Sequence, residues 1–244
     1  MKTIRKIHSL WIAFKAVIST LYFSSICIYQ CYRHRPLSDI NRTIRNWAQS
    51  MLAIVKLSYH VYNPHNVTPT AHRAWIIMSN HSSLYDIPLI FMALPGNIRM
   101  VTKKELFDIP VWGHAMKACK FIAIDRKNST QAIEDLKIAQ KQMEEEGVIP
   151  WVSPEGTRSR DGKLNPFKAG GFFLALQTNA IIIPVGIRGA RDILPAKTLD
   201  VCLHANVEVH IGEPIDTSEY SIQTRKALIH TVRESIKSLA DITE

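Results

Sequence analysis

The sequence predicts an α/β protein whose mixed, largely parallel sheet is flanked by helices and preceded by an N-terminal helical pair. After residue 60, short apolar runs alternate with longer helical stretches, and this alternation is typical of parallel sheets covered by helices. The chain has 244 residues, 46% hydrophobic and 21% charged, which excludes a disordered chain and suffices for a core without disulfides. We therefore expect an N-terminal segment, 1–60, and an α/β domain, 61–244.

The positive charge of the chain is concentrated in its first sixty residues. The formal net charge is +9, and residues 1–60 hold nine lysines and arginines against the single acid Asp39. The remaining chain is therefore close to neutral. A basic leader on a neutral body fits an anionic membrane surface at least as well as a nucleic acid. Since the sequence contains no recognised nucleic-acid-binding module, we do not expect a nucleic-acid partner.

The first helix is expected around the uncharged, mostly apolar run Ala16–Tyr32. A helix of this length is about 25 Å long, slightly short of a hydrocarbon core of about 30 Å. Basic residues lie on both sides of the run, so both of its ends favour the cytoplasmic side. This pattern favours a helix embedded in one leaflet over one that spans the bilayer, and a cleaved signal peptide is a weaker alternative.

A second helix is expected after Pro36, with Ser38 as its N-cap. Its apolar residues and its basic residues fall on opposite faces at helical spacing. That pattern is typical of a helix lying in a membrane interface. The alternative is a helix packed on its own domain with a solvated basic face. The apolar stripe comprises Ile40, Ile44, Trp47, Met51, Ile54 and Val55, and the basic face Arg42, Arg45 and Lys56.

The domain is expected to contain six strands separated by helices. The predicted strands are Trp75–Ser79, Ile98–Thr102, Phe121–Ile124, Ile149–Val152, Ile181–Val185 and Val207–Ile211. The predicted helices are Leu84–Leu94, Val111–Ala118, Ser129–Glu146, Phe167–Thr178 and Glu219–Asp241.

The four cysteines do not indicate a disulfide framework or a structural zinc site. Cys27, Cys31, Cys119 and Cys202 form no Cys-x-x-Cys pair, and no cluster of Cys and His ligands is visible in the sequence. A reducing compartment is therefore expected, and no metal is expected.

The segment Asn80–Asp86 follows the first predicted strand and contains a histidine and an aspartate five residues apart. On one continuous helix these side chains would point about 140° apart and could not touch. We therefore expect His81 in the turn and Asp86 in the first turn of the next helix. There the carboxylate can hold one imidazole nitrogen while the other takes a proton, which makes the pair a general base. The alternative is a helix-capping histidine followed by an acidic first turn.

The segment Pro154–Gly162 follows another apolar strand and has the composition of an anion-binding loop. Gly156 permits close approach to the backbone, Thr157 supplies a hydroxyl, and Arg158 offers a planar fork that matches phosphate oxygens. The alternative is a polar turn in which Arg158 pairs only with Glu155. Two further cations follow other strands, Lys103 and Arg126. Since parallel strands deliver their carboxyl ends to one edge, we expect these groups together.

These blocks resemble the motifs of the glycerolipid acyltransferases of the 1-acylglycerol-3-phosphate acyltransferase family. The His-x4-Asp block resembles the first motif, Ile124-Asp125-Arg126 the second, Pro154–Gly162 the third and Ile183–Gly189 the fourth. Their order and spacing agree, and the resemblance covers about half of the chain, from about Trp75 to Gly189.

The resemblance implies transfer of a fatty acyl group from acyl-CoA or acyl carrier protein to the sn-2 hydroxyl of 1-acylglycerol 3-phosphate, giving phosphatidic acid for phospholipid biosynthesis. His81 and Asp86 would be catalytic, and no bound cofactor is implied. Pro184 would shape the fourth motif or the acyl pocket. The residues implied for the phosphate pocket are Arg158, Arg126, Lys103, Glu155, Gly156 and Thr157, with Lys168 as a weaker candidate.

Two alternatives to this function stay open. One is the same chemistry on glycerol 3-phosphate, another lysophospholipid or a lyso-aminolipid, and the other is a non-catalytic protein that binds membrane surfaces. The resemblance and the basic leader together imply a membrane-associated protein on the cytoplasmic face, which in a bacterium is the inner membrane. Its expected partners are anionic lipids, a lysophospholipid acceptor and acyl carrier protein as one of the two donors.

Overall fold

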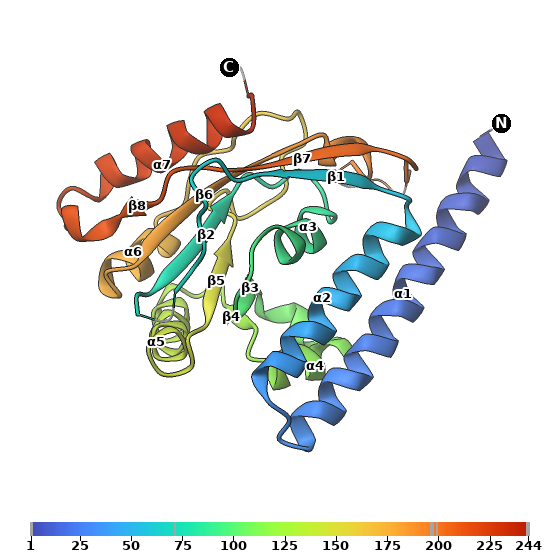
Figure 1. The fold of residues 1–244 in the computed structure, drawn as a ribbon, viewed down its shortest axis with the longest axis horizontal. Helices are drawn as coiled ribbons and strands as arrows, with labels where there is room; N and C mark the ends of the chain where they lie inside the picture. Colours follow the sequence, from blue (N-terminus) through green and yellow to red (C-terminus); the bar gives the residue numbers. More distant parts are fainter. Residues whose placement is uncertain (1, 71, 196–197, 199, 243–244) are drawn as a thin grey trace.

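The computed structural model describes residues 2–70, 72–195, 198 and 200–242, with the side chains of residues 2–6 and 129 left out. Its centre is a sheet with strand order β1-β7-β6-β2-β5-β3-β4, in which β8 also pairs with β6 (Figure 1). The strands are β1 (Ser58–Tyr62), β2 (Trp75–Ser79), β3 (Ile98–Lys103), β4 (Ile122–Ile124), β5 (Ile149–Val152), β6 (Ile181–Arg188), β7 (Asn206–Ile211) and β8 (Ile215–Asp216). The helices are α1 (Lys2–Tyr32), α2 (Leu37–Ile54), α3 (Asp86–Ala93), α4 (Trp112–Ala118), α5 (Ser129–Glu146), α6 (Gly170–Gln177) and α7 (Arg225–Leu239).

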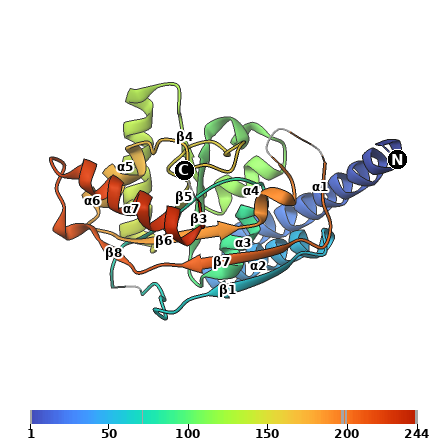
Figure 2. The same cartoon turned by 90° about the horizontal axis from the view of Figure 1, so that it is seen from above.

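Helices cover both faces of the sheet (Figures 1 and 2). Along β2, the side chain of Ile77 joins a core shared with α1 to α4, whereas Ile76 and Met78 join a core shared with α5 to α7. Alternation of this kind follows from the two-residue period of a strand. Every residue of β2 is buried, as expected for a strand covered on both faces.

The sheet is mixed, as predicted. Strands β6, β2, β5, β3 and β4 run parallel to one another. Strand β7 runs antiparallel to β6 and parallel to β1, and β8 runs antiparallel to β6. The four carboxyl ends of β2, β3, β4 and β5 therefore lie at one edge of the sheet.

The predicted elements of the domain are present with shifted boundaries. The predicted helix Phe167–Thr178 begins only at Gly170, and the predicted last helix, Glu219–Asp241, begins only at Arg225. Before α7, residues Thr217–Glu219 form a 3-10 turn (η3) instead. Strand β1 was not predicted from the sequence, because it mixes polar and aromatic residues at a half-exposed sheet edge.

Helix α1 is longer than the uncharged run that predicted it, because it continues through Lys15 to residue 2. The stretch Ile7–Tyr32 is long and apolar enough to cross a membrane by length and composition. Large apolar side chains on α1 are exposed, including Trp11, Phe14 and Tyr22. This helix therefore presents an apolar surface that the protein itself does not cover.

Helix α2 differs from its prediction in two respects. Its N-cap is Pro36 rather than Ser38, and no side chain caps the first turn. Its apolar residues Ile40 and Ile44 are buried in the core shared with α1 and α3, and Arg45 donates to the carbonyl oxygens of Phe91 (2.7 Å) and Leu94 (3.1 Å) at the end of α3. The apolar stripe of α2 thus packs on the protein's own core, while Arg45 of its basic face is bonded to α3 rather than solvated.

Candidate active site

The side chains expected to act together follow the carboxyl ends of parallel strands. His81 follows β2, the segment Pro154–Gly162 follows β5, Lys103 ends β3 and Arg126 follows β4. These strands are neighbours in the order β2-β5-β3-β4. The sheet topology thus brings the predicted segments to one edge, as the sequence indicated.

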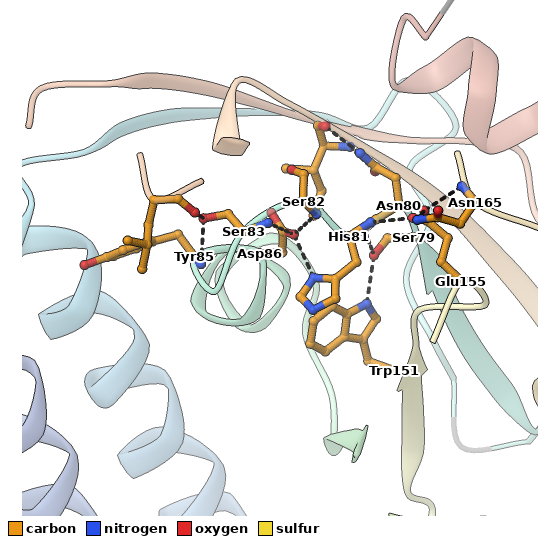
Figure 3. A network of polar contacts seen from close by, with 12 residues as sticks. Ser79, Asn80, His81, Ser82, Ser83, Tyr85, Asp86, Trp151, Glu155 and Asn165 are labelled. Atoms are coloured by element: carbon orange, nitrogen blue, oxygen red, sulfur yellow. Dashed lines mark hydrogen bonds and ion pairs between the residues drawn. The ribbon is translucent and has the colours of Figure 1, made fainter. Parts of the chain in front are cut away.

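His81 and Asp86 form the pair that the spacing predicted. His81 lies in the turn after β2, Asp86 is the first residue of α3, and His81 Nδ1 lies 2.8 Å from Asp86 Oδ2 (Figure 3). The same carboxylate oxygen accepts hydrogen bonds from the backbone N–H groups of Ser82 (2.7 Å) and Ser83 (2.8 Å). Asp86 is fully buried and therefore keeps the imidazole proton on Nδ1, which leaves Nε2 to accept a proton.

The backbone and the ring of His81 are also fixed. Its N–H donates to Glu155 Oε1 (3.0 Å), and its carbonyl oxygen accepts from the Ser159 N–H (2.7 Å). The ring lies edge-on to Trp151, with centroids 6.0 Å apart, and Figure 3 shows it between Asp86 and this indole. The imidazole is thus held by contacts from β5 and the loop after it.

Glu155 supports this arrangement from within the protein. Its second carboxylate oxygen accepts from the backbone N–H and the side-chain amide of Asn165, both at 2.8 Å. Burial raises the pKa of Glu155, while its hydrogen bonds with Asn165 and His81 act in the opposite direction. Since both oxygens face protein donors, the carboxylate shapes the site by holding two loops together. The sequence had assigned Glu155 to the phosphate pocket, and it did not indicate this direction of the side chain.

Three residues of the expected anion site lie next to one another. Arg126 donates through Nη1 to the carbonyl oxygen of Gly156. Gly156 has a φ of +71°, and a Cβ built there would lie 3.0 Å from Lys168 Nζ. A side chain at this position would be strained and crowded by the lysine. Burial lowers the pKa of Arg126. Glycine thus lets two cations approach one stretch of backbone.

Arg158 is half-buried, and no ion pair or hydrogen bond of its side chain occurs within the described part of the chain. The alternative in which Arg158 pairs with Glu155 is therefore wrong. Thr157 and Lys103 are exposed. Lys103 pairs with Ile124 in the β3–β4 register. Ile124 precedes Arg126 by two residues, so Lys103 and Arg126 belong to neighbouring strand ends. Within the described residues, Arg158 forms no ion pair, whereas the exposed Lys103 interacts electrostatically with Glu105.

Asp125 organises the loop that holds Arg126, although the sequence assigned it no separate role. It is buried, pairs with Lys104 Nζ, and accepts from the backbone N–H groups of Lys127 (2.9 Å) and Asn128 (3.1 Å). The hydrogen bond from Lys104 is the largest cause that lowers the pKa of Asp125, to about 2. In the sequence, the signal for this role was the position of Asp125 inside the second motif, between Ile124 and Arg126.

Asn80 is a second residue whose function the sequence did not indicate. Its side-chain amide donates to the carbonyl oxygen of Ile187 (2.9 Å) and accepts from the N–H of the same residue (2.8 Å). These two hydrogen bonds fasten the turn before His81 to β6. Asn80 therefore fixes the residue that precedes the histidine.

Pro184 lies in β6, where the neighbouring strand changes. Ile182 pairs with Ile215 of β8, Val185 pairs with Ile211 of β7, and the Gly212 N–H donates to the Pro184 carbonyl oxygen (2.9 Å). A proline lacks an N–H, so it suits a position where the ladder is interrupted. Pro184 is buried in the sheet and does not line the cavity described next. In the described structure it therefore lies where β6 changes its neighbouring strand.

A cavity of about 480 Å³ lies between α1, α2, α3 and α4. Nearly all of its lining is apolar, including Ile12, Trp47 and Phe91. Leu84 and Tyr85 also line it, and they lie between His81 and Asp86 in the chain. Burial raises the pKa of Tyr85 to about 12. The turn that positions the histidine thus forms part of the wall of an apolar chamber.

The chain is similar to a family of acyltransferases. The family model described as Acyltransferase matches residues 58–188, more than half of the chain. The chloroplastic 1-acyl-sn-glycerol-3-phosphate acyltransferase of Arabidopsis thaliana is 30% identical over 65% of this chain and 44% of its own length. The 1-acyl-sn-glycerol-3-phosphate acyltransferase alpha of Mus musculus is 30% identical over 73% of this chain and 62% of its own length. The chain spans about half the length of the curated relatives it matches.

A solved structure has the same fold. The crystal structure of the 1-acyl-sn-glycerophosphate acyltransferase from Thermotoga maritima matches with a TM-score of 0.81 at 24% identity, over 100% of both chains. The fold class predicted from the sequence is thereby confirmed.

The low pKa of Asp125 generates a prediction for the pH dependence of folding. A carboxyl group whose pKa is lowered in the folded protein stabilises it above the unfolded value, 3.8, and loses that contribution as the pH falls through about 2. We expect Asp125→Asn to lower the free energy of unfolding at neutral pH, and the difference from wild type to shrink between these two values. Urea unfolding followed by tryptophan fluorescence measures it, with Glu134→Gln on α5 as a control that changes little. A pH-independent difference would contradict the role of the charge.

Proposed function

Because this chain belongs to the Acyltransferase family, we propose that it transfers a fatty acyl group from acyl-CoA or acyl carrier protein to the sn-2 hydroxyl of 1-acylglycerol 3-phosphate, giving phosphatidic acid. The observation that supports this best is the hydrogen bond of 2.8 Å between His81 and the buried Asp86, at a sheet edge that also holds cations. A hydroxyl group attacks a thioester effectively only if a base takes its proton, and a phosphate needs positive charge. This edge offers both.

In the proposed reaction, His81 Nε2 removes the proton from the acceptor hydroxyl as its oxygen attacks the thioester carbonyl carbon. Asp86 stabilises the imidazolium that forms and holds its orientation. When the tetrahedral intermediate collapses, the C–S bond breaks and the new ester remains. His81 then returns the proton to the departing thiolate. The acyl group passes directly to the acceptor, so no acyl-enzyme is needed.

The acceptor phosphate is proposed to bind Arg158 and Arg126, with Lys103 and Lys168 adding positive charge. The half-buried Arg158 has no partner among the described residues and can form a bidentate pair with phosphate oxygens. Gly156 gives the phosphate access to the backbone beside Arg126 and Lys168. Thr157 is an exposed hydroxyl in the same loop.

The apolar cavity is proposed to hold the fatty acyl chain of a substrate. Its volume of about 480 Å³ falls within the usual range of ligand pockets. Leu84 and Tyr85 place its wall next to the catalytic turn. A chain bound there would keep its reacting end near His81 while its methylene groups stay out of water.

Helix α1 is proposed to embed its exposed apolar face in one leaflet on the cytoplasmic face of a membrane. Trp11, Phe14 and Tyr22 are more than half exposed, and aromatic residues favour the interface between lipid and water. Anionic lipids would attract the basic residues around this helix. An enzyme held in this way takes up and releases amphiphiles without extracting them into water.

The proposed chemistry predicts that His81→Ala lowers acyl transfer by about 10²- to 10⁴-fold, because the hydroxyl loses its base. The assay is thiol release from an acyl thioester by detergent-purified protein with lysophosphatidate, glycerol 3-phosphate or no acceptor. His210 is the matched control, because it is also 18% exposed and lies 2.8 Å from a carboxylate, Glu208, on β7. We expect His210→Ala to keep its activity. Thiol release without an acceptor would instead indicate a thioesterase, and equal activity of both variants would refute the assignment.

The proposed phosphate site predicts a selective defect in Arg158→Ala. Loss of a charged hydrogen bond costs about 1.5 to 3 kcal/mol, so the KM for lysophosphatidate should rise by about tenfold to a hundredfold while the KM of the acyl donor changes little. Arg160→Ala, an exposed arginine of the same loop, is the control. An equal rise in both KM values would argue against an acceptor site at Arg158.

The proposed role of α1 predicts that serine substitutions at Trp11, Phe14 and Tyr22 weaken membrane binding by more than about tenfold, because the aromatic surface that enters the leaflet is lost. Flotation with anionic liposomes measures this effect. These substitutions are preferable to deletion of residues 1–60, which would expose the core under α2. The control carries serine at Ile133 and Ile138, exposed to a similar degree on α5. Undiminished binding of the α1 variant, or an equal loss in the α5 variant, would refute the proposal.

A further inference from the structure

A second cleft, of about 420 Å³, lies at the β4 edge of the sheet. Strand β4 is the last in the strand order and pairs only with β3 among the described strands. It lies between α4 and α5 in both views (Figures 1 and 2). The wall of the cleft comes from the 3-10 turn η1 (Lys104–Asp108) and from α4, β4 and α5. The cleft thus includes the outer edge of a strand, which presents unpaired backbone N–H and C=O groups.

The lining of the cleft combines apolar side chains with a few polar ones. Phe107 is buried and Phe121 half-buried, whereas Ile138 of α5 is 58% exposed although it is large and apolar. An exposed isoleucine beside two aromatic rings offers an apolar surface to a flat ligand ring. A mostly apolar lining with a small number of polar groups is typical of small-molecule sites.

One polar side chain of the cleft lacks a partner. Gln142 of α5 is half-buried, its Oε1 is buried without a hydrogen bond, and its amide nitrogen forms none among the described residues. A buried amide without a partner is costly in free energy, and a ligand that bonds to it removes that cost. A half-turn of the amide exchanges oxygen and nitrogen without changing its shape, so either end can face the cleft. Amide side chains recognise adenine by accepting from its amino group and donating to its N7.

Two charged side chains of the cleft are also uncommitted. Lys117 and Asp108 line it, are exposed, and form no ion pair within the described residues. In contrast, Lys104 pairs with Asp125, and Asp135 accepts from the Asp125 N–H (2.7 Å). An ammonium group suits a phosphate, and a carboxylate suits a ribose hydroxyl. Since Asp125 belongs to the second motif, the cleft adjoins one loop of the candidate active site.

We propose that this cleft binds the adenosine and phosphate groups of an acyl-CoA donor, an inference that rests on the proposed function. The adenine ring lies against Phe107 and Ile138 and bonds to the amide of Gln142, while Lys117 receives a phosphate group. Acyl carrier protein carries the same pantetheine arm but no adenosine. The cleft therefore favours acyl-CoA over the other donor.

The distance from His81 to the cleft suits the pantetheine arm, which joins the thioester to the nucleotide. Three strand spacings separate β2 from β4, through β5 and β3, and they amount to about 14 Å at the usual spacing. The arm between sulfur and pyrophosphate has as many bonds as about four residues of chain, so it reaches about 15 Å when extended. A thioester at His81 and a nucleotide in the cleft can therefore belong to one molecule.

The first test is a calorimetric titration of CoA, which carries no acyl group, into the detergent-purified full-length protein. The double variant Gln142→Leu with Lys117→Ala should bind CoA at least about tenfold more weakly than wild type, because one neutral and one charged hydrogen bond are lost. The matched control, Gln140→Leu with Lys137→Ala, changes the same residue types on α5 outside the cleft and should keep the wild-type affinity. Equal weakening in both variants, or no binding of CoA to wild type, would overturn the proposal.

The second test compares two acyl thioesters that differ only in the nucleotide, acyl-CoA and acyl-pantetheine, with lysophosphatidate as acceptor. Wild type should have the lower KM for acyl-CoA. In the double variant this KM should rise at least about tenfold, while kcat and the KM values for acyl-pantetheine and lysophosphatidate stay unchanged. Equal KM values of wild type for the two thioesters would count against a nucleotide site.

Failure of this inference and failure of the proposed function give different results. Acyl transfer with the same KM for acyl-CoA in wild type and double variant would overturn the cleft assignment and leave the acyltransferase intact. CoA binding that only the double variant weakens, without thiol release from any donor, would support the cleft and refute the proposed reaction. Tighter binding of ATP than of CoA would overturn the assignment, because a free nucleotide would then be the ligand. If the double variant does not fold, Lys117→Ala, at an exposed position, decides both tests.

Discussion

The site depends on one buried negative charge, the carboxylate of Asp86. A carboxylate without solvent must be met by donors, and a single oxygen of Asp86 accepts from the His81 imidazole and from two successive backbone N–H groups. These donors fix the turn between β2 and α3, because Ser82 and Ser83 can reach the oxygen only if the chain folds back over the start of the helix. The direction of the histidine ring is therefore a consequence of satisfying that charge.

The other segments of the site are tied to this turn through their backbones. The Ser159 N–H reaches the carbonyl oxygen of His81, Glu155 accepts from the N–H of the same residue, and Asn80 holds the preceding position to β6. The parallel sheet brings the loops to one edge, and these bonds set their mutual positions. Side chains available for a substrate, such as Arg158, then project from a framework whose own polar groups are largely paired with one another.

The sequence predicted those parts of the fold that local patterns determine. Strands β2 and β5 are recognisable as apolar runs because both of their faces are buried. On one continuous helix the side chains of His81 and Asp86 would point apart, so their contact required His81 in the turn and Asp86 at the start of α3. Strand β1 was missed because its mixed polar and aromatic residues form no apolar run, and its strand partner β7 lies far along the chain. The residue type of Glu155 indicated a place in the site, but the direction of its side chain depends on a hydrogen bond from Asn165, ten positions away.

The cavity has one wall from the domain and one from α1, the helix whose outer side is apolar and exposed. If that helix lies in a leaflet, as proposed, an acyl chain can move from lipid to cavity sideways. The quantity that governs occupancy is then the mole fraction of substrate among the surrounding lipids, not its amount per volume of water. Diluting the surface with inert lipid at constant bulk concentration would slow such a reaction, whereas adding water would not.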